Sequence, residues 1–147
     1  MTGPQLLPGA VVPPLRRDFP LTRLVAYAGA TWDWHRLHYD PGYAAAHGLP
    51  GPVVDGQVLG ALLAEQLQSW LGPQCTLRTL RFRFARPVFA GESVLCTGRV
   101  TAVDGDLVTV EQHVEVTGDR PRTAVSSAGA TLTLAPPPAG PRPGEAP

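Results

Sequence analysis

The stretch DGQVLGALLAEQLQSWL, residues 55–71, decides the fold. It opens with Asp55, a residue type that commonly caps helices, and apolar residues then recur at helical spacing. The apolar positions are Val58, Leu59, Leu62, Leu63, Leu67 and Leu71. Because a stripe this broad is typical of a buried helix, the sequence predicts one from Gly56 to about Trp70.

Beyond this helix the pattern changes to alternation and to runs rich in Thr and Val. Four such stretches predict long strands. They are Leu77 to Phe84, Ser93 to Val103, Leu107 to Val116 and Thr123 to Leu134. Asp104-Gly105 is a strong hairpin signal, and residues 117–121 make a second break. We therefore expect these strands to run as an antiparallel meander.

One long helix and four strands in a short chain predict an α+β fold, with a curved antiparallel sheet wrapped around the helix. This is the hot-dog arrangement. The 147 residues match the size of one domain. An edge strand and a helix flank stay open in such a fold, and pairing of two subunits is a common way to cover them. We expect a homodimer, or a heterodimer with another hot-dog chain.

The parts of the chain ahead of the long helix and at its two ends carry weaker signals. We expect Thr22 to cap a short helix, and Asp40, followed by a proline, to cap another. Residues 1–17 are rich in Gly and Pro, and this favours an extended arm or an edge strand. Residues 136–147, six of which are proline, are expected to be disordered. The folded domain is then expected over residues 18–135.

Composition excludes several classes of function. Twelve basic and twelve acidic residues give no net charge, so neither nucleic acid nor an anionic membrane is an expected partner. No apolar run approaches the ~20 residues that a membrane span requires, and no signal-like stretch opens the sequence. Cys75 and Cys96 form no disulfide framework and lack metal-ligand spacing. We expect a soluble cytoplasmic protein without a metal site.

A polar and aromatic segment, TWDWHRLHYD at residues 31–40, contains the candidate chemistry. Asp33 lies five residues before His38, and Asp55-Gly56 opens the long helix seventeen residues further on. Hydration of an α,β-unsaturated thioester needs a base for water, an acid for Cα and donors for the enolate oxygen. Asp33 and His38 could supply the first two, and the free N–H of Gly56 the third.

These residues are part of a longer match. Residues 27–56 resemble the R-specific enoyl-CoA hydratase signature of MaoC-like dehydratases, in which D-x-N-P-[aliphatic]-H precedes an H-G that starts the helix. Asp33, Leu37 and His38 match the first element. The resemblance implies a hydro-lyase with Asp33 and His38 as the catalytic pair, acting in fatty acid metabolism without a metal or an organic cofactor.

The similarity to this family continues along the chain. Residues 43–48 match the Y-A-x-x-x-G that follows the first element, and residues 82–92 resemble F-x-[RK]-P-V-x-x-G-D. In all, the resemblance covers Asp18 to Leu134. It implies a substrate bound as a thioester to coenzyme A or to an acyl carrier protein.

Three departures from the signature bear on the site. His35-Arg36 replaces Asn-Pro, so His35, which we count with Asp55 and Gly56 among the expected oxyanion and substrate-binding residues, either takes over the hydrogen-bonding role of the Asn that helps to hold the pair or marks a different subfamily. Thr31-Trp32 stands where the signature has Ser-Gly. Asp55 replaces the His before Gly56, and a carboxylate there would oppose an oxyanion unless its charge turns away to cap the helix.

Alternatives remain for the function and for single residues. An accessory hot-dog subunit of a heteromeric dehydratase would tolerate the departures, and a hot-dog thioesterase uses the same scaffold. Asp33 could instead be a turn residue, and His38 a structural histidine. We interpret Trp32 and Trp34 as packing against the sheet or a partner subunit. Three arginines alternate along one strand face, which we interpret as a solvated face: Arg81, Arg83 and Arg86.

Overall fold

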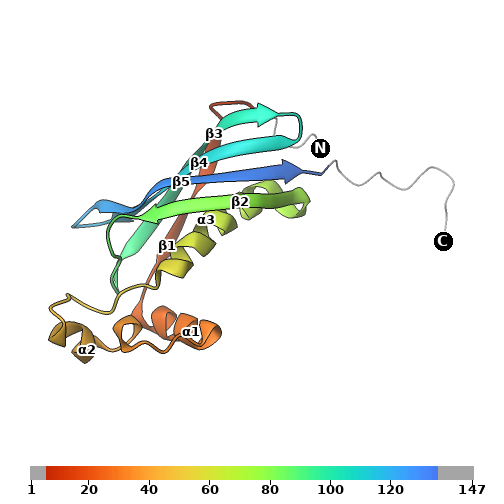
Figure 1. The fold of residues 1–147 in the computed structure, drawn as a ribbon. Helices are drawn as coiled ribbons and strands as arrows, with labels where there is room; N and C mark the ends of the chain where they lie inside the picture. Colours follow the sequence, from red (N-terminus) through yellow and green to blue (C-terminus); the bar gives the residue numbers. More distant parts are fainter. Residues whose placement is uncertain (1–5, 136–147) are drawn as a thin grey trace, which may run out of the picture.

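The computed structural model describes residues 6–135, so the tail predicted to be disordered lies outside the described residues. It contains one antiparallel sheet with a long helix against it and a lobe of short helices at one end (Figure 1). The strands are β1 (Val11–Asp18), β2 (Cys75–Phe84), β3 (Ser93–Asp104), β4 (Leu107–Thr117) and β5 (Arg122–Leu134). The helices are α1 (Leu21–Thr31), α2 (Pro41–Ala46) and α3 (Gly56–Leu71). The predicted hot-dog fold is confirmed.

Helix α3 begins and ends as its sequence predicts. The Asp55 carboxylate accepts a hydrogen bond from the Gln57 N–H at 2.9 Å, and Gly72, with φ of 74°, follows the last turn. The buried residues of α3 lie on the face toward the sheet: Leu59, Gly60, Leu62, Leu63, Gln66, Leu67 and Leu71. The opposite face, including Glu65 and Gln68, is exposed. The helix is therefore buried on one side rather than all around.

Two buried glutamines join α3 to the sheet. The Gln112 amide of β4 donates to the Leu63 carbonyl and to the Gln66 side chain, both at 2.9 Å. The Gln66 amide in turn donates to the backbone carbonyls of Pro13 at 2.9 Å and Cys96 at 3.1 Å. Because buried amides need partners, this network fixes both the height and the rotation of α3 over the sheet.

A close approach also sets the position of α3 relative to β2. A Cβ atom on Gly60 would lie 2.6 Å from the ring of Phe82, and one on Gly56 would lie 2.5 Å from the ring of Phe84. Atoms do not pack at such distances, so glycine at both positions lets the two rings rest on the helix backbone. The first two turns of α3 are thereby held against the end of β2.

The predicted meander is correct for β3, β4 and β5 and wrong for β2. The strand order is β1-β3-β4-β5-β2, so β2 pairs with β5 at the far edge and not with β3. The chain between Phe84 and Ser93 makes no hairpin turn, because it crosses beside the segment that leads into α3. There the Val54 N–H donates to the Val88 carbonyl at 2.8 Å. This crossing segment fixes the residues that precede Asp55.

The N-terminal part of the chain is an edge strand, one of the two alternatives that the sequence left open. Strand β1 pairs with β3, and its register shifts between Val12 and Leu15 at the Pro13-Pro14 pair. The predicted boundary after residue 17 falls inside this strand, because the alternating side chains of β1 continue the sheet to Val11. None of the helices in the described residues has the length and apolar character needed to cross a bilayer.

The predicted caps of the two short helices have different outcomes. Asp40 caps α2 by accepting from the Tyr43 N–H at 3.0 Å, as expected. Thr22 does not cap α1, because the helix begins one residue earlier, after Pro20. The fixed φ of proline ends the extended segment there, and Thr22 lies inside the first turn. Helix α1 ends at Thr31, and the φ of 58° at the following Trp32 turns the chain toward Asp33.

Candidate active site

The geometry of His38 defines which of its ring nitrogens can react. His38 ends a short 3-10 turn, Arg36–His38, and its Nδ1 lies 2.8 Å from the Val53 carbonyl oxygen. A carbonyl oxygen can only accept a hydrogen bond, so in the neutral ring Nδ1 carries the proton and Nε2 carries a free lone pair. The Leu37 carbonyl accepts from the Val53 N–H at 2.9 Å, and this second bond ties the turn to the same strand-like segment.

Asp33 faces this free nitrogen. Its Oδ2 lies 3.9 Å from His38 Nε2, and its Oδ1 accepts from the His35 N–H at 3.2 Å. A separation of 3.9 Å is too long for a direct hydrogen bond and leaves room for an atom that contacts both groups. Both side chains are partly buried. The structure therefore brings together the two residues that the sequence predicted as a pair.

The His35 side chain contacts the local backbone and does not line the cavity. Its Nδ1 accepts from the Leu37 N–H at 3.1 Å and so caps the turn that carries His38. Its ring stands edge-on to Tyr43 at 5.9 Å, and the residue is exposed. These contacts fit the role of the replaced Asn, which helps to hold the catalytic pair, and contact of His35 with substrate stays a prediction. Through its own N–H and its ring, His35 positions Asp33 and His38.

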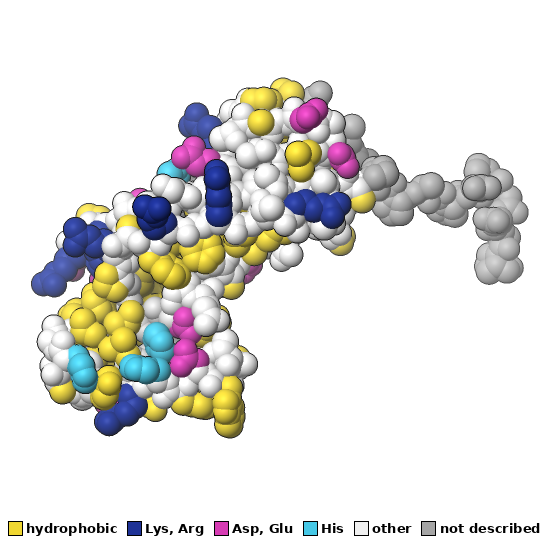
Figure 2. Space-filling model, viewed as in Figure 1, with side chains coloured by type: hydrophobic (Ala, Val, Ile, Leu, Met, Phe, Trp, Pro, Cys, Tyr) yellow, Lys and Arg dark blue, Asp and Glu magenta, His cyan; other side chains and the backbone are white. Residues whose placement is uncertain are grey.

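A largely apolar cavity opens beside Asp33 and His38. It holds about 300 Å³ of space not filled by atoms, part of it open to solvent. The apolar lining comes from Phe19, Leu24, Tyr27, Ala28, Val54 and Val58, and the polar lining from Arg23, Asp33, His38 and Asp55. Figure 2 shows histidine and acidic side chains close together on the small lobe, beside hydrophobic ones. An apolar cavity with a few convergent polar groups is the usual form of a small-molecule site.

Asp55 has two roles that the sequence did not separate. One oxygen caps α3, as expected, whereas Oδ2 is buried and has no hydrogen-bond partner among the described residues. Asp33, His38 and Asp55 each have one side-chain N or O atom that lies within 4.8 Å of the corresponding atoms of the other two. Burial, and then the charge of Asp55, raise the pKa of Tyr27. The charge of Asp55 is thus directed partly into the cavity, and the expectation that it turns away holds for one oxygen.

The same three residues are where a metal ion would bind if the protein held one. Two carboxylates and an imidazole are a donor set that divalent transition metals accept. The sequence predicts no metal, and that stays a prediction. The same atoms serve equally as acceptors for water, since carboxylate oxygens and an unprotonated ring nitrogen accept hydrogen bonds.

Gly56, the predicted oxyanion donor, begins α3 directly after Asp55, which lines the cavity. As the first residue of α3, it has no partner for its N–H among the hydrogen bonds of the described residues. The ring of Phe84 covers its Cα, so the glycine also has a packing role that the sequence did not reveal. Because the aromatic contact depends on the crossover of β2 to the sheet edge, no local pattern could have predicted it.

Most of the chain matches a known protein family. Residues 12–123 match the model of the MaoC like domain. The chain belongs to the MaoC-like dehydratase family. It is 32% identical over 103 residues to a 3-oxo-4,17-pregnadiene-20-carboxyl-CoA hydratase beta subunit of Mycobacterium tuberculosis, covering 70% of this chain and 80% of that protein. It is 30% identical over 95 residues to an (R)-specific enoyl-CoA hydratase of Aeromonas caviae, covering 63% and 69%.

Solved structures agree with the family and the fold. The ChsH1–ChsH2 complex from M. tuberculosis contains a chain that matches with a TM-score of 0.79 and 29% identity, covering 88% of this chain and 98% of that one. The (R)-hydratase from A. caviae matches with a TM-score of 0.80 and 26% identity, covering 90% and 100%. The chain therefore belongs to a family of hydratases and dehydratases and has the hot-dog fold of that family.

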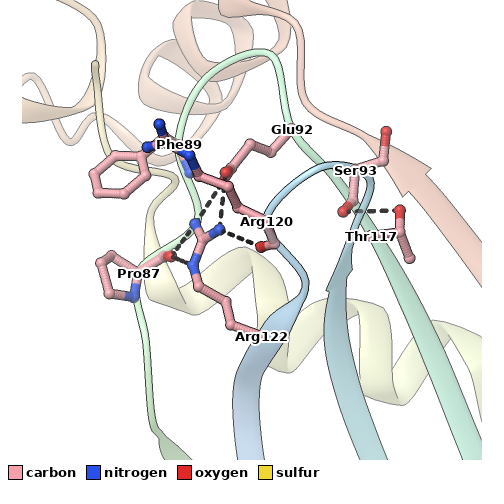
Figure 3. Close-up of polar contacts among 7 residues, drawn as sticks. All are labelled: Pro87, Phe89, Glu92, Ser93, Thr117, Arg120 and Arg122. Carbon is pink, nitrogen blue, oxygen red and sulfur yellow. Dashed lines mark hydrogen bonds and ion pairs between the residues drawn. The ribbon is translucent and has the colours of Figure 1, made fainter. Parts of the chain in front are cut away.

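An ion pair supports the segment that leads into the site (Figure 3). The Arg122 guanidinium contacts both oxygens of Glu92, at 2.9 and 2.6 Å, and also donates to the Pro87 carbonyl at 2.8 Å. Glu92 accepts from the Phe89 N–H at 2.8 Å. These contacts hold the crossing segment whose Val88 carbonyl binds the backbone just before Asp55. The MaoC-like chain therefore anchors its helix start through residues that do not themselves line the cavity.

Removal of Glu92 should change how stability depends on pH. Burial of the Glu92 carboxyl would raise its pKa, but hydrogen bonds from Arg122 and the Phe89 N–H outweigh this and lower it. A lowered pKa in the fold means stability that is present above the ordinary value of 4.5 and is lost as the pH falls below it. We expect Glu92→Gln to flatten the loss of stability below about pH 4.5.

Urea unfolding at several pH values between neutral and acid measures this effect. Glu111→Gln is the matched control. Glu111 also faces a basic side chain, with its Oε1 3.4 Å from His113 Nε2, but it is exposed. If Glu92→Gln and the wild-type chain lose stability in parallel with falling pH, the ion pair does not contribute in the way described.

Proposed function

We propose that this MaoC-like chain is a hydro-lyase that hydrates 2-enoyl thioesters, or dehydrates 3-hydroxyacyl thioesters, bound to coenzyme A or an acyl carrier protein. The observation that carries the proposal is the pairing of His38 Nε2, freed by the Nδ1 contact to Val53, with Asp33 Oδ2 at 3.9 Å. The pair lies at an apolar cavity. Relatives named as CoA hydratases support the reaction class.

The proposed chemistry uses groups of this chain alone. A water molecule between Asp33 and His38 donates hydrogen bonds to both, and its oxygen attacks Cβ of the enoyl group. A proton of this water passes to the Asp33/His38 pair, while electrons move from the double bond onto the thioester oxygen. The pair then returns a proton to Cα, so that water adds across the bond and the pair regains its first state.

The thioester oxygen carries negative charge at the midpoint of this reaction. The Gly56 N–H, at the positive end of the sixteen-residue helix α3, is the donor that we assign to it. Asp55 opposes this charge from the neighbouring position, and its cap on Gln57 holds one of its oxygens away. No cofactor is needed for any of these steps.

The hydration assay tests the proposal. Loss of the absorbance of the conjugated 2-enoyl-CoA on addition of the protein is the expected result, measured on the chain and on any hot-dog chain that copurifies with it. A thioesterase would instead release free coenzyme A thiol from a saturated acyl-CoA. Thiol release without hydration would contradict the proposal.

The accessory-subunit alternative has its own support. The departures at His35-Arg36 and Asp55 lie within the site, and structural neighbours include the ChsH1–ChsH2 complex and the HadBC complex of M. tuberculosis. In that alternative the partner supplies the reacting groups. Alteration of Asp33 would then leave the activity of the complex unchanged, and this outcome separates the two proposals.

The exposed tryptophans of the loop after α1 bear on whether this chain assembles with a partner. Trp32 is 80% exposed and stands edge-on to the partly exposed Trp34 at 6.0 Å. Packing of both rings against the sheet of the same chain, one of the two interpretations from sequence, is therefore wrong, because Trp32 is mostly exposed and Trp34 is 43% exposed. An apolar loop left in water favours cover by a partner chain. We propose a homodimer or a heterodimer of hot-dog chains; the cytoplasmic location stays a prediction.

Activity should be lost when the assembly is diluted. We propose that the partner chain completes the cavity beside Asp33 and His38, so dilution below the dissociation constant should lower the specific activity together with the molar mass. Light scattering and the hydration assay on the same samples measure both. A mass near the 15.6 kDa of one chain with full activity retained would refute the expectation.

A further inference from the structure

The cavity beside Asp33 and His38 contains a carboxylate oxygen that the chain itself leaves without a partner. Asp55 Oδ2 is buried and receives no hydrogen bond from the described residues, whereas the other carboxylate oxygen of Asp55 caps α3. Arg23 lines the same cavity, yet no ion pair joins it to Asp55 among the described residues. Because buried polar atoms almost always have a partner, this oxygen marks a position where a bound ligand can donate a hydrogen bond.

A hydrocarbon acyl chain fits this oxygen poorly. The rest of the lining is largely apolar, and the cavity of about 300 Å³ has room for a short chain. A hydrocarbon chain bound there would cover Oδ2 and donate nothing to it, and a carboxylate covered without a hydrogen bond costs free energy. An acyl group that carries its own donor avoids this cost. Asp55 therefore favours substrates with an O–H or N–H group inside the cavity.

The position of Asp55 limits where this donor lies on the substrate. Asp55 has a side-chain atom within 4.8 Å of atoms of both Asp33 and His38. Since the proposed mechanism places Cβ of the double bond at these two residues, the donor belongs within a bond or two of that carbon. In an unbranched acyl chain the double bond has the thioester carbon on one side and C4 on the other. C4 is therefore the carbon that can carry the donor.

A second polar side chain of the cavity fits a hydroxyl better than a charged donor. Tyr27 lines the same cavity as Asp55. Burial, and then the charge of Asp55, raise the pKa of Tyr27, so its phenol keeps its proton and can donate. A hydroxyl can donate to Asp55 and accept from Tyr27, whereas an ammonium group can only donate. The two side chains together favour a hydroxyl.

We propose that this chain acts on short 2-enoyl or 3-hydroxyacyl thioesters that carry a hydroxyl group on C4, and that Asp55 accepts a hydrogen bond from this hydroxyl. The inference rests on the proposed hydro-lyase function, because that function places the double bond at Asp33 and His38. It assigns the choice of substrate to Asp55, a residue that stands where the family signature has histidine.

Two enoyl thioesters that differ by one hydroxyl test the inference. The hydration assay compares trans-2-butenoyl-CoA with trans-4-hydroxy-2-butenoyl-CoA, on this chain together with any hot-dog chain that copurifies with it. Because the hydroxyl also changes the reactivity of the double bond, the ratio of the two kcat/KM values is compared between variants. Asp55→Ser removes Oδ2 and keeps a residue type that caps helices well. We expect it to lower the ratio, hydroxylated over plain, by roughly 10- to 100-fold, as for loss of a hydrogen bond to a charged group.

The matched control makes the same change at another helix cap. Asp40 caps α2 by accepting from the Tyr43 N–H at 3.0 Å, but it does not line the cavity. Asp40→Ser should keep the ratio within about twofold of the wild-type value. Circular dichroism checks that each variant folds. Should Asp55→Ser not fold, Asp55→Asn replaces it; this variant keeps the shape and lacks the charge, and should lower the ratio by roughly fivefold or more.

Binding of saturated thioesters separates this inference from the proposed reaction. Butanoyl-CoA and 4-hydroxybutanoyl-CoA have no double bond to hydrate, so calorimetry measures their dissociation constants whether or not the chain is an enzyme. We expect the hydroxylated compound to bind roughly 10- to 100-fold more tightly to the wild-type chain, and the difference to disappear in Asp55→Ser. This preference without hydration of either enoyl thioester would support the role of Asp55 and contradict the reaction. Equal binding of both compounds to the wild-type chain, or the same ratio in the wild-type chain and Asp55→Ser, would overturn the inference.

Discussion

Replacement of Asp33 by Asn, or of His38 by Ala, is expected to lower kcat for hydration by about 100-fold or more without unfolding the protein. Each change removes an acceptor that faces the water position between the two side chains, which lie 3.9 Å apart. Both residues lie on the segment between α1 and α2, and neither belongs to the buried core. The loss should therefore appear in the chemical step.

His38 has a second contact that the experiment must keep separate. Its Nδ1 binds the Val53 carbonyl, so alanine also frees the turn that carries it. His38→Asn retains a donor near the Nδ1 position but has no group at Nε2. We expect His38→Asn to be as inactive as His38→Ala while resembling the wild-type chain in thermal unfolding. Recovery of activity in His38→Asn would mean that the histidine only holds the loop.

A matched control lies on the same lobe. His47 Nδ1 lies 2.8 Å from the Tyr43 carbonyl, the same kind of contact, yet His47 is exposed and does not line the cavity. His47→Ala should leave kcat within about twofold of the wild-type value, as expected for a surface residue outside the site. Wild-type activity in both Asp33→Asn and His38→Ala would remove the pair from the mechanism. Unchanged activity of a complex that carries them would place the chemistry in the partner.

Local signals predicted most of the elements and the pair itself. The cap at Asp55 and the hairpin at residues 104–105 each depend on neighbours in sequence, and both are confirmed. The position of β2 is different in kind. Whether a strand joins the near or the far edge of a sheet depends on contacts between distant residues, and here the segment crossing in front of α3 decides it.

The same distinction applies to the site. Spacing and family resemblance predicted Asp33, His38 and Gly56, whereas the roles of their neighbours depend on packing. The apolar wall includes Tyr27, which comes from α1, and the ring over Gly56 comes from β2. The sequence left open how His35 takes the place of the Asn, and the structure shows that its Nδ1 accepts from the Leu37 N–H two residues away. The sequence therefore predicted which polar side chains come together better than it predicted what surrounds them.

Replacement of Leu63 by Ala is expected to lower the free energy of unfolding by about 2–5 kcal/mol. Leu63 is 0% exposed and lies in the middle of α3, in the cluster that joins the helix to β3, β4 and β5. Deletion of its side chain removes buried apolar contacts and leaves a cavity that the neighbours fill only in part. Gln112 donates to the Leu63 carbonyl, so its hydrogen bond remains and the loss measures packing alone.

Urea unfolding at one fixed protein concentration measures this loss, because assembly makes stability depend on concentration. Leu107→Ala is the matched control: it deletes the same side chain at a site that is 39% exposed, at the start of β4. There the change should be within about 1 kcal/mol. Leu63→Ala with a loss below about 0.5 kcal/mol would contradict a central helix buried against the sheet. A large loss limited to Leu63 would place the core of the fold at the face of α3 that also positions Gly56 for the proposed chemistry.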